Sequence, residues 1–391
     1  MVEWKKLGTL GSFENIGTDK KIIDGEQLVT LLNYVDVYHH KHIDVSVPQM
    51  VVSASDKKIK DCSVEQGDIF VTPSSETVDD IGHSSVIEET ISNAVYSYHI
   101  MRYRLFEKNM LLSYYINYAF DTDIVKKQIL KKAQGLTRFG LSKDKFASIE
   151  IPIPSLSEQQ RIVEQLDTFT SSIENLKEQI AQRRKQYEYY RDELLDLEGK
   201  EGVEIAPLRR IVKSYCTGAT PNKGHLEYYE SGTIPWLRTQ DVKFNEIYEI
   251  DSFVTEEAVA KTGVKWIPAN CVIVAISGAT AGRCAINKIP TTTNQHCLNL
   301  EINPKKALYK YVYYCVYNAY SDMISKKQGA RGDLNSSIIL GITIPVPSLS
   351  EQQRIVSILD TFEASIQNLE AQLSQREKQY EYYRNKLLTF E

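Results

Sequence analysis

The sequence predicts an α+β protein in which two mixed α/β globular domains are joined by two long helices that pair as a coiled coil. The prediction rests first on an internal repeat, because residues 151–198 align without a gap with residues 344–391. Both copies carry apolar residues at heptad spacing, and a stretch with strand and turn signals precedes each copy. We therefore expect one unit, a globular domain followed by a helix, to occur twice along the chain.

Each copy of the repeat opens with a signal for the start of a helix. A pair of prolines excludes helix at the opening itself. The Ser-Leu-Ser-Glu-Gln-Gln that follows offers two overlapping capping boxes, Ser155 with Glu158 and Ser157 with Gln160 in the first copy. A helix is expected from this point in both copies.

The residues that follow form an apolar seam in steps of four and three. In the first copy the seam comprises Ile162, Leu166, Phe169, Ile173, Leu176, Ile180, Tyr187, Tyr190, Leu194 and Leu197, interrupted by Arg183. In the second it comprises Ile355, Leu359, Phe362, Ile366, Leu369, Leu373, Tyr380, Tyr383, Leu387 and Phe390, with Arg376 at the equivalent interruption. A period near 3.5 over about five heptads calls for a partner helix and a left-handed supercoil. The expected partner of each helix is the other copy.

Length and composition bound the rest of the molecule. The 391 residues are 42% hydrophobic, enough for two ordinary domains besides the two helices. No apolar run approaches the roughly 20 residues of a membrane span, and the first residues lack the pattern of a signal peptide. We therefore expect a cytoplasmic protein that does not associate with a membrane.

The cysteines and histidines form no recognisable disulfide or metal pattern. Cys62, Cys216, Cys271, Cys284, Cys297 and Cys315 are scattered without a C-x-x-C pair, so we expect them to be reduced and mostly structural. His39, His40 and His42 form an H-H-x-H cluster, but no second group of ligands follows at a known spacing. A solvated polar loop is favoured there, and no metal site is predicted.

The globular segments share a plan. In residues 1–150, which we call the first head, we expect strands at 69–72 and 93–105 and a helix at 110–132 with a basic end, followed by a turn at 134–140 suited to phosphate contact. In residues 204–343, the second head, we expect a strand at 271–276 and a helix at 309–327. Residues 151–203 are the first helix with its linker, and residues 344–391 are the second helix. The helices are alike, whereas the heads have diverged.

Charge does not by itself indicate a polyanion partner, since the formal net charge is −5. Of the four segments, only the second head has more basic than acidic residues. DNA binding would therefore need local basic clusters, or a partner that supplies the remaining positive charge.

Several motifs resemble the specificity subunit of type I restriction-modification systems. They are Pro-Ser-Leu-Ser-Glu-Gln-Gln-Arg-Ile-Val at 154–163 and 347–356, Arg-x-Lys-Gln-Tyr-Glu-Tyr-Tyr-Arg at 183–191 and 376–384, and Ile-Pro-Trp-Leu-Arg-Thr-Gln-Asp-Val at 234–242. The resemblance covers the full chain. The first head fits less well, because Asn33 to Asp36 stand where Arg238 to Asp241 stand in the second head and lack the arginine.

The resemblance implies a non-catalytic DNA reader with pseudo-twofold symmetry. Each head would be a target recognition domain for one half of a split double-stranded DNA site with a fixed gap, and the two helices would pair antiparallel. Two methyltransferase subunits would dock on the assembly, with restriction or motor subunits as further partners. S-adenosylmethionine, ATP and magnesium would belong to those partners, so no cofactor is expected on this chain. In agreement, the sequence has no Asn-Pro-Pro-Tyr motif and no G-x-x-x-x-G-K-[ST] loop.

Residues on predicted loops are the candidates for DNA contact. Arginine pairs well with guanine, asparagine and glutamine pair with adenine, and lysine mostly contacts phosphate. The candidates in the second head are Arg238, Thr239, Gln240, Ser277, Thr280, Arg283, Lys326, Lys327, Gln328 and Arg331, and those in the first head are Lys57, Lys58, Lys131, Lys132, Gln134 and Arg138. A solvated surface position is the alternative for each. Gly135 and Gly329 suit either close approach to DNA or a helix C-cap.

Two pairs of tyrosines are candidates for contact with a protein partner. Tyr189 and Tyr382 fall outside the seam, at positions that a two-stranded coil would leave in water, and Tyr190 and Tyr383 follow them. Exposed aromatic residues at equivalent places suggest a docking patch for the methyltransferase. Packing against the heads is the alternative.

Two other classes of protein remain possible at this level. One is a DNA-modifying enzyme whose active site lies unrecognised in a head, and the other is a coiled-coil scaffold that binds no nucleic acid. Transfer of a labelled methyl group to DNA by the purified chain would identify the first. Unchanged DNA mobility in the presence of the methyltransferase would identify the second.

Overall fold

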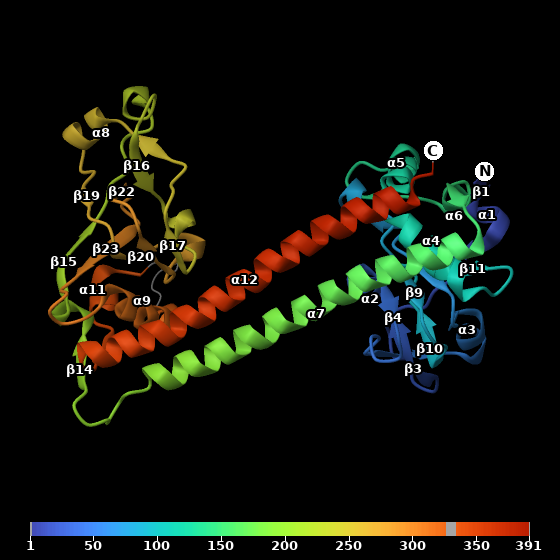
Figure 1. Cartoon of the computed structure of the whole chain (residues 1–391), viewed down its shortest axis with the longest axis horizontal. Coiled ribbons are helices and arrows are strands. Elements are labelled where there is room, and N and C mark those ends of the chain that lie inside the picture. The colour runs from blue at the N-terminus through green and yellow to red at the C-terminus, as the bar shows by residue number, and fades with distance from the viewer. Residues whose placement is uncertain (1, 326–333, 391) are drawn as a thin grey trace. The chain divides into compact units, whose positions relative to one another are not determined.

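The computed structural model describes residues 2–325 and 334–390 and divides into two compact units. One unit comprises residues 1–178 with 370–391, and the other comprises residues 179–369. Each unit contains one head together with half of each long helix (Figure 1). Among the residues described, no helix has the length and apolar character needed to cross a membrane.

The first head is built on two sheets. The five-stranded sheet has the order β2 (Gly11–Glu14), β11 (Met101–Leu105), β7 (Ile69–Val71), β9 (Ser84–Ile87), β4 (His42–Ile43), and the four-stranded sheet has the order β5 (Met50–Ala54), β3 (Gln27–Leu32), β10 (Ile91–Tyr96), β6 (Ser63–Val64). Two short pairs, β1 (Glu3–Lys6) with β13 (Glu150–Ile153) and β8 (Ser74–Ser75) with β12 (Phe139–Gly140), complete the strands. The helical segments are α1 (Leu7–Leu10), α2 (Tyr34–His39), α3 (Asp56–Asp61), η1 (Val78–Asp80), α4 (Met110–Phe120), α5 (Asp123–Lys132) and α6 (Lys143–Ala147).

The second head repeats this topology. Its five-stranded sheet has the order β15 (Val212–Thr217), β23 (Cys297–Ile302), β20 (Val272–Ala275), β21 (Cys284–Asn287), β17 (Asn245–Ile247), and its four-stranded sheet has the order β18 (Phe253–Val254), β16 (Ile234–Leu237), β22 (Thr291–Thr293), β19 (Trp266–Ile267). Strand β14 (Glu204–Pro207) pairs with β24 (Thr343–Val346). The helical segments are η2 (Leu208–Arg210), η3 (Leu226–Tyr228), η4 (Thr239–Asp241), α8 (Glu256–Lys261), η5 (Gly278–Thr280), α9 (Tyr309–Asn318), α10 (Tyr320–Ser325) and α11 (Ser336–Leu340). The heads therefore share one fold although their sequences have diverged.

The cores explain why the predicted strands form. Strands β7 and β20 lie at the centre of the five-stranded sheets, and all their residues are buried, as expected for a short apolar run covered on both faces. The helices α4 and α9 pack on these sheets through buried tyrosines. The seam residues Leu166 and Leu359 join the same cores, so each head is continuous with its part of the coil.

Three element predictions are corrected by the structure. The strand expected at 93–105 is two strands, β10 and β11, because the chain turns at Ser97, whose carbonyl accepts the Ile100 N–H. The helix expected at 110–132 is two helices, because Thr122 caps the Val125 N–H and starts α5 afresh. The helix expected at 309–327 is α9 and α10 as far as Ser325, and residues 326–327 lie outside the described part.

The long helices α7 (Leu156–Leu195) and α12 (Leu349–Leu388) begin where the repeat predicts. Ser155 Oγ accepts the Glu158 N–H at 3.4 Å, but the Glu158 carboxylate pairs with Arg161 instead of closing a capping box. The second expected box is wrong, since Ser157 lies inside the helix and Gln160 donates to Glu164. A single serine cap therefore starts each helix, because Ser348 Oγ accepts the Glu351 N–H at 3.3 Å in the second copy.

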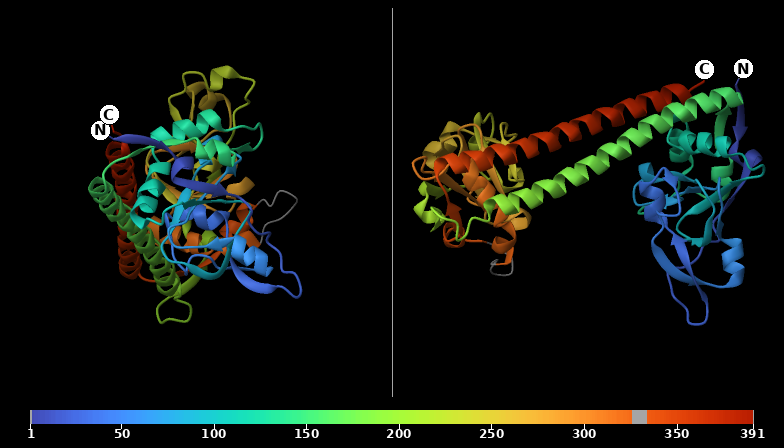
Figure 2. Two further views of the ribbon diagram at one scale, coloured as in Figure 1. Left: turned by 90° about the vertical axis from the view of Figure 1, so that its right-hand side faces the viewer. Right: turned by 60° about the horizontal axis from the view of Figure 1, so that its bottom comes forward.

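Within each unit the halves of α7 and α12 lie side by side and run antiparallel (Figure 1, Figure 2). In the second unit Phe362 stacks on Tyr190, with ring centroids 5.4 Å apart, and Arg183 lies over the same ring at 5.8 Å. In the first unit Phe169 stacks on Tyr383 at 5.4 Å, with Arg376 over it at 5.7 Å. Arg183 and Arg376 therefore belong to the seam that they were expected to interrupt. The predicted antiparallel coil and the α+β class are confirmed.

Candidate nucleic-acid interface

In the second head a short turn presents three of the candidate residues. Strand β16 ends at Leu237, and the Arg238 N–H donates to the Asp241 carboxylate at 2.8 Å. This bond closes the one-turn helix η4 and places Arg238, Thr239 and Gln240 at the end of the strand. Arg238 is partly buried, and its Nε has no hydrogen-bond partner among the residues that the structure describes.

The turn η5 lies against η4 and presents the other described candidates of this head. Gly278 and Gly282 have φ angles of 74° and 91°, which favour glycine. A Cβ at Gly282 would also meet the Tyr320 ring at 3.1 Å. Ser277, Thr280 and Arg283 flank these glycines and are partly exposed. The structure thus brings together two groups of three predicted residues, one at η4 and one at η5, that are far apart in sequence.

A third loop at this edge was missed as a candidate. Asn294 N–H donates to the Leu237 carbonyl at 3.0 Å, and the neighbouring Gln295 accepts a hydrogen bond from Thr220. Gly218 holds the Thr220 loop against this strand, because a Cβ there would lie 1.8 Å from the Thr293 carbonyl oxygen. Only the strand pairing reveals what this glycine contacts.

The remaining candidates of the second head, Lys326, Lys327, Gln328 and Arg331, lie outside the described residues, as does Gly329.

In the first head, two of the candidate lysines bind backbone carbonyls of the chain itself. Lys58 Nζ donates to the carbonyls of Ile16 and Gly17 at 2.7 and 3.1 Å, and Lys132 Nζ donates to the Ser148 carbonyl at 2.9 Å. Lys57 and Lys131 are exposed.

Gln134 and Arg138 lie on a hairpin that follows α5. The Gln134 N–H donates to the Gly140 carbonyl at 3.0 Å, and the Gly140 N–H donates back at 2.8 Å. Gly135 has a φ of 145°, and a Cβ there would lie 1.9 Å from the Arg138 carbonyl oxygen. The hairpin explains this glycine, because α5 already ends at Lys132, with Ala133 as its C-cap. The Arg138 guanidinium lies 3.3 Å from Ser74 Oγ on the paired strand β8.

The first-head candidates do not form one surface. Lys57 and Lys58 lie on α3, which packs against the strands β5, β6 and β10. Lys131, Lys132, Gln134 and Arg138 lie on α5 and its hairpin, which contact η1 and β8. The two groups are well separated within the first unit (Figure 1).

The candidate tyrosines are exposed in both copies of the repeat. Tyr189 and Tyr382 are 63% and 59% exposed, and each makes an edge contact with the tyrosine that follows it, at 5.3 and 5.2 Å. Tyr190 and Tyr383 stack on the seam phenylalanines and still remain 43% and 41% exposed. Each pair therefore continues from the seam to the surface of the coil.

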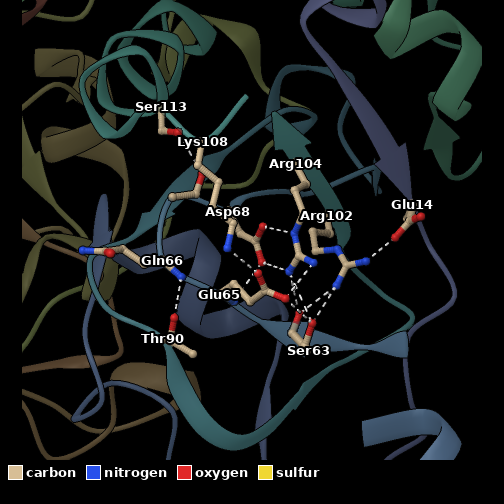
Figure 3. Close-up of polar contacts among 11 residues, drawn as sticks. Glu14, Ser63, Glu65, Gln66, Asp68, Thr90, Arg102, Arg104, Lys108 and Ser113 are labelled. Carbon is tan, nitrogen blue, oxygen red and sulfur yellow. Dashed lines mark hydrogen bonds and ion pairs between the residues drawn. The ribbon is translucent and has the colours of Figure 1, made fainter. Parts of the chain in front are cut away.

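A partly buried charged network in the first head is the strongest candidate for a ligand or metal site outside these surfaces (Figure 3). Arg104 donates to both oxygens of Asp68 at 2.6 Å and to Glu65 at 2.9 Å, beside a pocket of about 260 Å³. Arg102 pairs with Glu14 and donates to the Ser63 carbonyl at 2.8 Å. Burial raises the pKa of Asp68, although the bond from Arg104 acts in the opposite direction. Because these acids already have partners, the network ties β11 to β2, to β6 and to residues 65–68.

No group of three or more His, Cys, Asp or Glu side chains within residues 2–325 and 334–390 is placed to hold a metal ion. The six cysteines are free thiols, and all but Cys216 are buried. His42 of the histidine cluster contacts Glu88 at 3.4 Å and Asp167 at 3.7 Å, and thereby joins β4 to α7. The cluster is therefore not simply the polar loop that was expected, because His39 ends α2 and His42 lies on β4.

The two heads have one topology, and each forms a compact unit with half of each long helix, so the chain is an internally repeated two-domain protein. Residues 8–183 and 200–377 both match the type I restriction modification DNA specificity domain. The chain belongs to this family. The predicted class, a DNA-recognition subunit and not an enzyme, is thereby confirmed.

Known relatives agree with this assignment. The Escherichia coli EcoR124I/EcoR124II specificity subunit is 35% identical over 270 residues, which cover 66% of this chain and 66% of the relative. The chain thus spans about two thirds of that relative's length. The crystal structure of the type I specificity subunit from M. genitalium superposes with a TM-score of 0.60 at 15% identity, over 100% of this chain and 97% of that one. A chain from a study of complex assembly and conformational transition in the type I restriction-modification system gives 0.59 at 15% identity, over 99% and 96%. At this identity the two structures show the shared fold.

Proposed function

We propose that the two heads bind double-stranded DNA and that each reads one half of a split target. The observation that carries this proposal is the repetition of one fold with different side chains at its polar turns. A shared frame with two different surfaces suits a protein that reads two different sequences. In the second head, the surface formed by η4 and η5 offers Arg238, Gln240 and Arg283, whose donors suit guanine and adenine edges.

We further propose that the coil binds two methyltransferase subunits, one at each tyrosine pair. Exposed aromatic residues at equivalent places in both copies support two equivalent docking sites. In the second unit, Tyr190 and Phe362 also line a groove of about 740 Å³ together with Leu194 and Ile358. Restriction or motor subunits would be further partners. S-adenosylmethionine, ATP and magnesium would be held by the partners, and the assembly would act in the cytoplasm.

Exchange of one head tests the proposal. Replacing residues 204–343 by the corresponding domain of another family member should change one half of the methylated motif and leave the other half. The reciprocal exchange of residues 1–150 is the matched control and should change the other half. Methylation is read by sequencing DNA from cells that carry each chimera with its methyltransferase. A change in both halves from one exchange would contradict independent reading.

Two measurements separate the other classes. Methyl transfer to DNA by the purified chain alone would show an enzyme. DNA mobility that stays unchanged when the chain and the methyltransferase are added together would show a scaffold without nucleic-acid binding.

A further inference from the structure

The shared topology locates a surface in the first head that matches the η4–η5 surface of the second. Strand β3 of the first head occupies the place of β16, and the strands β7 and β9 occupy the places of β20 and β21. The turn after β3 is closed as η4 is, since the Asn33 N–H donates to the Asp36 carboxylate at 2.9 Å. Asn33 therefore stands in the place of Arg238.

The turn η1 matches η5 in the same way. Gly82 has a φ of 89° and donates its N–H to the Thr72 carbonyl after β7 at 2.9 Å, whereas Gly282 has a φ of 91° and donates to the Ala275 carbonyl at 2.8 Å. The residue after each glycine precedes the next strand, so His83 stands in the place of Arg283. Asp80 at the end of η1 likewise stands in the place of Thr280.

Side chains from three elements meet on this first-head surface. The Tyr38 ring of α2 packs on the His83 ring at 4.4 Å, and the Tyr38 hydroxyl lies 3.5 Å from Asp80. Tyr34 stacks on Tyr38 at 5.8 Å. The hairpin that carries Arg138 pairs with β8, which contacts η1. The surface thus combines one arginine with a carboxylate, an imidazole and two aromatic rings.

The charges on this surface differ from those in the second head. A hydrogen bond from the Thr77 hydroxyl, 2.5 Å from Asp80, holds the pKa of that carboxyl below its usual range. Burial lowers the pKa of His83, whose Nε2 lies 3.6 Å from the Asp80 carboxylate. An ionised carboxylate accepts hydrogen bonds only, and among base edges it suits the amino group of cytosine.

We propose that the first head reads its half-site through Asp80, His83, Tyr38 and Arg138, with Asp80 as the acceptor for a base amino group. This inference rests on the proposed function and assigns its first-head site. Lys57 lies outside the surface. Lys57 lies on α3, and the corresponding helix of the second head is α8. Helix α8 begins with Glu256 and Glu257, so the two heads do not share a basic surface at this helix.

The test compares Asp80→Asn and Arg138→Ala with the matched control Lys57→Ala, each in the full chain with its methyltransferase. The readout is the ratio of affinities for the cognate duplex and for duplexes with one base pair changed in either half-site. The domain exchange described above shows which half belongs to the first head. Asp80→Asn should lower discrimination at one first-half base pair by about 5- to 150-fold. Arg138→Ala should weaken binding to the cognate duplex.

Discrimination in the second half should stay intact in both variants, which separates a lost contact from a misfolded protein. Lys57→Ala should keep the wild-type ratios. Unchanged first-half discrimination in Asp80→Asn together with unchanged affinity in Arg138→Ala would overturn the inference, as would a first-half change in Lys57→Ala. A wild-type complex that discriminates in neither half would instead overturn the proposed function.

Discussion

Replacing Phe362 by leucine should destabilise the coil by a predictable amount. Leucine keeps most of the apolar bulk of the side chain. It removes the ring that stacks on Tyr190 and makes a cation–π contact with the Arg183 guanidinium. An aromatic pair contributes about 0.5–1.5 kcal/mol beyond its buried area, and a cation–π contact at an exposed site about 0.5–1 kcal/mol. The free energy of unfolding should therefore fall by about 1–2.5 kcal/mol.

The pseudo-symmetry of the coil supplies an internal comparison. Phe169 has the same two contacts with nearly the same ring distances, so Phe169→Leu should cost as much as Phe362→Leu to within about 0.5 kcal/mol. Phe106→Leu is the matched control, because Phe106 is 66% exposed. Its effect should stay within about 0.5 kcal/mol of zero.

Urea unfolding of the isolated chain, followed by circular dichroism in the helix band, measures these differences. A double-mutant cycle between Phe362→Leu and Arg183→Met should give a coupling of about 0.5–1 kcal/mol. If Phe362→Leu and Phe106→Leu gave equal losses, the ring contacts would not contribute to the stability of the coil.

Three further predictions concern the partners, the DNA and pH. Tyr189→Ala and Tyr382→Ala should each weaken methyltransferase binding about tenfold in calorimetry while the unfolding midpoint stays in place, and equal affinity would remove these tyrosines from the docking site. Lys326→Ala should lower the slope of log K against log salt by about one unit, whereas Arg331→Ala should relax one base position by about 1–3 kcal/mol; unchanged binding in both would exclude this segment from the DNA site. Burial lowers the pKa of His42, which Asp167, Glu88, Lys41 and Tyr118 surround, so the unfolded chain binds a proton more readily. Stability should therefore fall below about pH 6.5, and less steeply in His42→Gln; an equally steep fall in that variant would contradict the assignment.

The sequence alone determined the long helices and their pairing. A heptad seam is a local pattern, and two copies of it in one chain leave few alternatives for the partner. The start of each helix could be predicted for the same reason, because a proline pair and a serine cap act within one turn. The sequence did not show that Ser155 alone caps its helix, because this depends on the hydrogen bonds that the neighbouring side chains make. Nor did it show that Arg183 belongs to the seam, because this depends on its contact with the Phe362 ring of the other helix.

Only the tertiary structure showed that the two heads have the same fold and where their surfaces correspond. Strand order arises from pairings between distant residues, such as β3 with β10, and diverged sequences can satisfy the same pairings with different side chains. The roles of individual lysines were also hidden from the sequence. Lys58 and Lys132 resemble Lys57 in every local respect, yet their ammonium groups are bound to backbone carbonyls that only folding brings within reach.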